Sequence, residues 1–225
     1  MNTIKRYPVA STLSFYTISE EIANSVLHGI GTLGAIAGFI LLGLKTTGFW
    51  GIEKISNLNI MAVLLFAATM IGMFLISTLY HAIQNQNAKR ILRKLDHCVI
   101  FIFIAGTYTP FCLISLKGVW GWSLFAFEWS MVIFGITMNI LGFKAIKKIE
   151  IAAYVMMGWA IIVGFIPLFR YVPVQSIVLL IVGGAAYTLG IIWYRMKSIR
   201  LTHTVWHVFV IMGTVCHWFS IWFLI

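Results

Sequence analysis

Seven long apolar blocks occupy most of this 225-residue chain. A helix needs about 20 apolar residues to cross the hydrocarbon core of a bilayer, whereas a barrel strand needs about half that length and alternates polar with apolar residues. The blocks do not alternate, and the connections between them are short. We therefore predict seven membrane-spanning helices, over residues 22–44, 58–80, 98–116, 119–142, 151–169, 174–194 and 204–225.

The composition supports this class. Apolar residues make up 61% of the chain and charged residues 10%, and the mean hydropathy is +0.97. Soluble domains average about 45–50% apolar and about 25% charged residues, so a soluble domain and a disordered chain are both excluded. The predicted fold is an all-α integral membrane protein, a seven-helix bundle over residues 21–225 that follows a short N-terminal segment over residues 1–20. The three cysteines, Cys98, Cys112 and Cys216, fall in apolar stretches and are interpreted as buried thiols.

The basic residues predict an orientation. Twelve of the sixteen Lys and Arg residues lie in the N-terminal segment and in the loops after the second, fourth and sixth spans. Only Lys45, Lys54, Lys117 and Arg170 lie on the opposite side. Lys and Arg collect in cytoplasmic loops, so we predict a cytoplasmic N-terminus and an external C-terminus. This bias explains the net charge of +10, and we expect no nucleic-acid partner.

Rare polar residues gather at the cytoplasmic ends of four predicted spans. Ionisable groups inside a membrane are costly and are functional candidates by default. The polar residues of this layer are Glu21, Asn24 and His28 in the first span, Ser77 and His81 at the end of the second, Asp96 and His97 at the start of the third, and His203 and His207 at the start of the seventh. Random scatter would not be expected to place them in one layer.

The histidine spacing suggests a metal site. His203 and His207 are four residues apart, so both imidazoles project from one helical face. With His81 from a neighbouring helix they would give three nitrogen ligands and an open fourth position, the pattern of catalytic zinc. Zinc lowers the pKa of a bound water to about 7. Asp96 could orient that water or accept its proton, and Ser77 could hydrogen-bond the water, a substrate carbonyl or a ligand.

Spacing alone leaves other interpretations open. A histidine pair at this spacing is common, and membrane histidines often only hydrogen-bond a neighbouring helix. A haem held by two histidines would need ligands from different helices. His217 lies about 15 Å deeper than His207, so we interpret it as a packing or hydrogen-bonding residue. The role of His97 stays open.

The order of motifs resembles a known family. Glu21-x-x-Asn24-x-x-x-His28, Ser77-Thr78-Leu79-Tyr80-His81, Leu95-Asp96-His97, Gly106-Thr107-Tyr108-Thr109-Pro110-Phe111 and His203-x-x-x-His207 follow one another as in hemolysin III-like proteins. These proteins form the bacterial branch of the progestin and adipoQ receptor family, within a superfamily that includes alkaline ceramidases. The resemblance runs from about Glu20 to the end of the chain.

The resemblance implies a zinc ion bound by His81, His203 and His207 near the cytoplasmic side. It implies that Asp96 holds the zinc-bound water and that Ser77 precedes the first ligand by one turn. It also implies a multi-pass protein of a bacterial cell membrane. The chain lacks the long N-terminal extension of the animal receptors, so hormone binding is not carried over.

Three functions are compatible with these features. The first is a zinc-dependent hydrolase that cleaves a lipid amide or ester and maintains membrane lipid composition, with a membrane lipid as substrate. The second is a hemolysin-type pore or channel, which should show a continuous polar stripe across the membrane. The third is a metal-dependent membrane sensor without turnover. The sequence predicts neither the substrate nor the oligomeric state.

Overall fold

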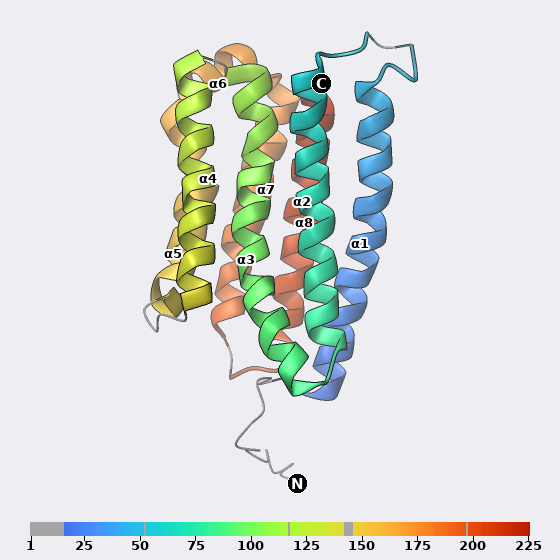
Figure 1. Ribbon diagram of the computed structural model, residues 1–225, viewed down its shortest axis with the longest axis vertical. Helices are drawn as coiled ribbons and strands as arrows, with labels where there is room; N and C mark the ends of the chain where they lie inside the picture. Colours follow the sequence, from blue (N-terminus) through green and yellow to red (C-terminus); the bar gives the residue numbers. More distant parts are fainter. Residues whose placement is uncertain (1–15, 52, 117, 142–145, 197) are drawn as a thin grey trace, which may run out of the picture.

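The computed structural model describes residues 16–51, 53–116, 118–141, 146–196 and 198–225, which form helices and no strand (Figure 1). The elements are α1 (Ile18–Thr46), α2 (Asn57–Ala82), α3 (Gln86–Pro110), the π-helical segment η1 (Phe111–Leu116), α4 (Gly118–Leu141), α5 (Ile146–Gly158), the 3₁₀ segment η2 (Ala160–Gly164), α6 (Phe165–Tyr171), α7 (Val174–Arg195) and α8 (Thr202–Leu224). Lys5, Arg6, Lys117, Lys144 and Lys197, which enter the predicted orientation, lie outside the described residues.

Six of these helical stretches are long and apolar enough to cross a membrane, and a shorter apolar stretch, Ile149–Gly164, lies where the fifth span is predicted. The predicted all-α membrane bundle is therefore confirmed. Five of the seven predicted spans agree with the observed helices to within a few residues at each end. The predicted membrane orientation remains a prediction from the charge distribution.

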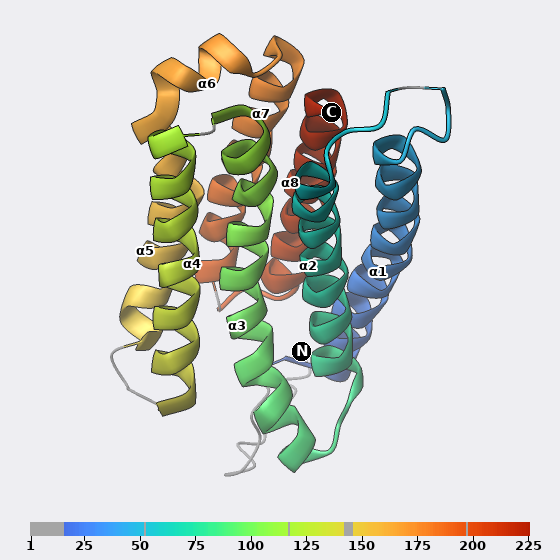
Figure 2. The same cartoon turned by 45° about the horizontal axis from the view of Figure 1, so that its top comes forward.

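The fifth span is not the single helix that we predicted. It consists of α5, η2 and α6, and α6 lies across one end of the bundle (Figure 2). Gly158 and Gly164 mark the two interruptions, and glycine is a poor helix former. Pro167 then lies in the first turn of α6, where a missing N–H group does no harm. Tyr108 on α3 bridges the first interruption, because its hydroxyl donates to Gly158 O at 2.9 Å and accepts from Ile161 N at 3.1 Å.

The third span begins earlier than predicted. Residues 86–97, assigned mainly to a loop, form the first three turns of α3. Asn85 caps this helix, since its side-chain oxygen accepts hydrogen bonds from Asn87 N and Ala88 N at 3.1 Å. These turns are polar, so hydropathy detects only the apolar remainder of the helix. The extension brings Lys89 into the bundle, where its side chain is buried.

The long helices pack side by side. Neighbours along the chain from α1 to α4 contact one another, α7 packs against α8, and α8 packs against α1. The stretch Gln86–Leu116 is the most enclosed, with 61% of its apolar window buried compared with 28% for α1. Large apolar side chains cover the outside of α1, among them Ile22, Val26 and Ile30. Such a surface suits contact with lipid.

Candidate metal centre

Three histidines converge at one end of the bundle. His81 comes from the last turn of α2, and His203 and His207 come from the first turns of α8. One ligand atom of each lies within 4.8 Å of the others, and His81 and His207 are buried while His203 is half-buried. The structure therefore brings together the three residues that the sequence predicts as metal ligands.

The donor atoms suit a small tetrahedral ion. His81 Nε2 and His207 Nε2 are 3.2 Å apart. Two nitrogens bound to one tetrahedral zinc at about 2.0–2.1 Å lie about 3.3 Å from each other. His207 Nδ1 is buried with no hydrogen-bond partner among the described residues. Nitrogen donors at this separation fit zinc, and His81, His203 and His207 would hold it.

His81 is oriented by an acidic residue on α1. Its Nδ1 lies 2.6 Å from Glu21 Oε2, so an Nδ1–H group donates to the carboxylate. The other carboxylate oxygen of Glu21 is 2.9 Å from Lys89 Nζ, and all three side chains are almost fully buried. A protonated Nδ1 leaves the lone pair of Nε2 directed toward the other histidines. Metal-ligating histidines commonly have such a carboxylate partner.

A polar seam between α1 and α8 sets the position of the two α8 histidines. Glu20 Oε1 accepts a hydrogen bond from Leu201 N at 2.8 Å, just before α8 begins. One turn further along α1, Asn24 Oδ1 accepts from Thr204 Oγ1 at 2.6 Å.

The seam ends at a pair of histidines. The rings of His28 and His207 have centroids 3.9 Å apart. Residues four apart lie on one helical face, so Glu20, Asn24 and His28 contact α8 along one continuous line of α1.

Ser77 and Asp96 lie beside the cluster. Asp96 lies close enough to Ser77 and to His81 to interact with both side chains electrostatically. Asp96 does not join the three histidines as a fourth close ligand atom among the described residues. This placement is compatible with the predicted roles, in which Asp96 acts through a water molecule rather than on the metal.

Two further histidines belong elsewhere. His97 Nδ1 is 2.8 Å from Glu150 Oε2, and the single Tyr154 hydroxyl proton is shared between the same carboxylate and His97 O. His97 therefore joins α3 to α5. His217 Nε2 donates to Leu180 O at 3.2 Å, which agrees with its predicted hydrogen-bonding role.

The cysteines show no disulfide. All three thiols are free, with Cys98 and Cys112 buried as expected and Cys216 half-buried.

Sequence reasoning assigned no role to three neighbours of the cluster. From the sequence, Glu21 is only a polar residue of the first span, and Lys89 is only a basic residue of a predicted loop. Their pairing depends on two different helices, so no spacing rule could reveal it. Tyr16 stacks on His203 with ring centroids 4.6 Å apart, and it precedes the first predicted span.

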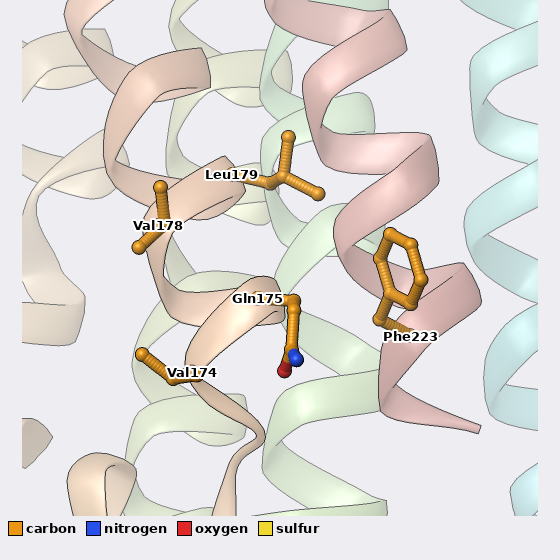
Figure 3. Close-up of a pocket in the computed structure, with 5 residues that line it drawn as sticks. All are labelled: Val174, Gln175, Val178, Leu179 and Phe223. Atoms are coloured by element: carbon orange, nitrogen blue, oxygen red, sulfur yellow. The ribbon is translucent and has the colours of Figure 1, made fainter.

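Surface pockets lie at both ends of the bundle. One, of about 360 Å³, lies between the start of α7 and the end of α8, and Gln175 is the polar residue of its lining (Figure 3). Another, of about 590 Å³, lies against the histidine end. Its apolar wall includes Ile18, Ile22 and Val26, and its lining also includes Glu21 and His81.

Comparisons with known proteins agree with this architecture. The chain is 36% identical to the hemolysin-3 homolog of Bacillus subtilis over 92% of its own length and 95% of that protein. It is 34% identical to hemolysin-3 of Bacillus cereus, over 92% of each chain, and 27% identical to the human monocyte to macrophage differentiation factor, over 92% of its own length and 84% of that protein. No solved structure is significantly similar to it. The family model for haemolysin-III-related proteins matches residues 16–218, and the chain belongs to this family of membrane proteins.

Proposed function

We propose that the chain is a zinc-dependent membrane hydrolase that cleaves an amide or ester bond of a membrane lipid. The observation that carries this proposal is the convergence of His81, His203 and His207 beside Asp96. Three histidines with an adjacent carboxylate suit hydrolysis better than a purely structural site, because structural zinc sites use four protein ligands.

The side chains around the histidines support this chemistry. Bound zinc would act as a Lewis acid and lower the pKa of a coordinated water. Glu21 holds His81 in one tautomer and one ring orientation. Asp96 would accept a proton from the water nucleophile, and Ser77 would keep its carboxylate in place.

The position of the cluster favours a lipid substrate. His203 and His207 lie in the first six residues of α8, within about 8 Å of its start at about 1.5 Å per residue. The ester and amide bonds of lipids lie at a similar depth, between headgroup and hydrocarbon. The 590 Å³ pocket on α1 presents apolar side chains to an acyl chain and reaches Glu21 and His81. We propose that this end faces the cytoplasm in a bacterial cell membrane.

Metal analysis combined with a hydrolysis assay tests the proposal. Purified protein is expected to contain about one zinc per chain and to hydrolyse ceramide-like or phospholipid substrates. His207→Ala should lose both zinc and turnover. His217→Ala is the matched control, because it removes a buried histidine from the same helix about 15 Å away and should retain zinc. Equal zinc content in both variants would contradict the site, and zinc without any turnover would favour a sensor.

The name of the Bacillus cereus relative, hemolysin-3, favours a second candidate, a pore. Single-channel recordings in lipid bilayers separate the two. Conductance that persists after zinc is removed would support a pore. Bilayers that show no channel conductance but contain hydrolysed lipids would support the hydrolase.

A further inference from the structure

Glu128 is a buried acid far from the histidine cluster. It lies ten residues from the start of α4, about 15 Å along a helix about 36 Å long, and so near the middle of the span. Its side chain is completely buried, and neither carboxyl oxygen has a hydrogen-bond partner among the described residues. Removing an isolated carboxylate from water is very costly, so the group must be neutralised.

The buried face of α4 turns this acid toward the interior of the bundle. The buried positions of the helix are Gly121, Glu128, Val132 and Gly135, which follow helical spacing along one stripe. Gly121 lies so close to η1 that an added Cβ would be 2.2 Å from Cys112 O. The acid therefore lies on the face that packs against other helices rather than on the face that meets lipid.

The elements packed against α4 have interrupted backbones. Pro110 ends α3 and removes one backbone donor, and the π-helical η1 follows directly. On the other side, α5 ends at Gly158 and continues as the 3₁₀ segment η2, which also contacts α4. Irregular backbone at membrane depth is tolerated where it is buried in protein or lines a polar cavity. In membrane transporters, unwound backbone carbonyls at such breaks coordinate Na⁺ or H⁺.

The neighbouring titratable groups supply no positive charge. From α3 and η1, Tyr108 and Cys112 lie close enough to Glu128 to interact electrostatically. Tyr108 also bridges the interruption of the fifth span through Gly158 and Ile161. No Lys, Arg or His forms an ion pair with Glu128 in the part of the chain that the structure describes. A cation from solution would supply the missing charge.

We propose that Glu128 and the interrupted backbone of the third and fifth spans form a binding site for a monovalent cation, H⁺ or Na⁺, in the membrane interior. The site is separate from the histidine cluster and does not depend on the proposed hydrolase activity. Its occupant exchanges with the solution. This exchange distinguishes the site from a permanently neutral structural acid, which would keep its proton at every pH.

Labelling with dicyclohexylcarbodiimide tests this proposal directly. This apolar reagent reacts with protonated carboxyl groups inside membranes, and mass spectrometry of the digested protein locates the adduct. The full-length protein in phospholipid vesicles is labelled between pH 5.5 and 9, in NaCl or in N-methylglucamine chloride at equal ionic strength. Glu128→Gln is the control for assignment of the adduct, and the experiment itself uses the native chain.

The two cations predict different results. A proton site predicts that the labelling rate of Glu128 falls up to about tenfold per pH unit above the midpoint of its titration. The rate should not depend on the sodium concentration. A sodium site predicts an additional slowing of about tenfold when Na⁺ reaches about ten times its dissociation constant. Labelling that is independent of both pH and sodium, or that appears only after unfolding in dodecyl sulfate, would overturn the proposal.

Discussion

Replacing Glu21 by Gln tests how the bundle orients its first histidine. The carboxylate accepts a hydrogen bond from His81 Nδ1 at 2.6 Å and pairs with Lys89 at 2.9 Å. The amide keeps the size of the side chain but removes its charge. It would therefore hold the imidazole less firmly and leave the ammonium group of Lys89 without its ionic partner.

The two consequences have different magnitudes. Loss of a partner that orients a metal-ligating histidine commonly weakens metal binding about 10- to 100-fold, which is about 1.4–2.7 kcal/mol. Breaking a buried ion pair by removing one partner costs about 3–5 kcal/mol of folding stability. Lys89 is 1% exposed, so this second cost should be near the full amount.

A second substitution separates the effects. Lys89→Met in the Glu21→Gln background removes the unpaired charge and should restore much of the stability without restoring zinc affinity. Zinc affinity is measured by competition with a chelator in detergent, and stability by thermal unfolding of the metal-free protein. Ser25→Ala, on the same helix, is the matched control, because the Ser25 hydroxyl donates to Thr78 O and hydrogen-bonds to neither His81 nor Lys89 in the described part of the chain. A double variant that binds zinc as tightly as the native chain would refute the orienting role of Glu21.

Three further predictions concern other parts of the bundle. Asp96→Asn should lower kcat about 10²- to 10⁴-fold while zinc content is retained; loss of zinc instead would show that Asp96 supports the metal itself. Tyr108→Phe removes both hydrogen bonds across the interrupted fifth span and should lower stability by about 1–3 kcal/mol in thermal unfolding, and an unchanged midpoint would show that the bridge is dispensable. Gly183→Ala should lower the free energy of unfolding by about 1–3 kcal/mol in the same thermal unfolding assay, since its Cβ would lie 2.3 Å from a ring atom on α8. Gly34→Ala, which meets nothing within 4 Å, should be neutral, and equal losses in both would contradict this packing argument.

The packing glycines show where sequence patterns fall short. Gly34, Gly38 and Gly183 are all glycines inside predicted spans, and the sequence does not distinguish them. In the structure, an added Cβ at Gly38 or Gly183 would collide with a ring from α8, whereas Gly34 faces open space. Spacing places residues on a face of a helix, but only the assembled bundle decides which face meets a neighbour.

The amino-acid sequence alone predicts the class of protein, the approximate spans and the residues of the histidine layer. It could do so because hydrophobic length and four-residue spacing are local properties of a helix. It missed the broken fifth span and the early start of α3, where glycine, proline and polar turns override hydropathy.

The packed bundle sets how these residues are grouped. It joined Glu21 to His81 and Lys89 from three helices, placed His97 in a cluster with Glu150, and buried Glu128 without a hydrogen-bond partner among the described residues. These pairings depend on the rotation of each helix against its neighbours. That rotation is set by side-chain packing across the whole bundle, and no short stretch of the chain records it.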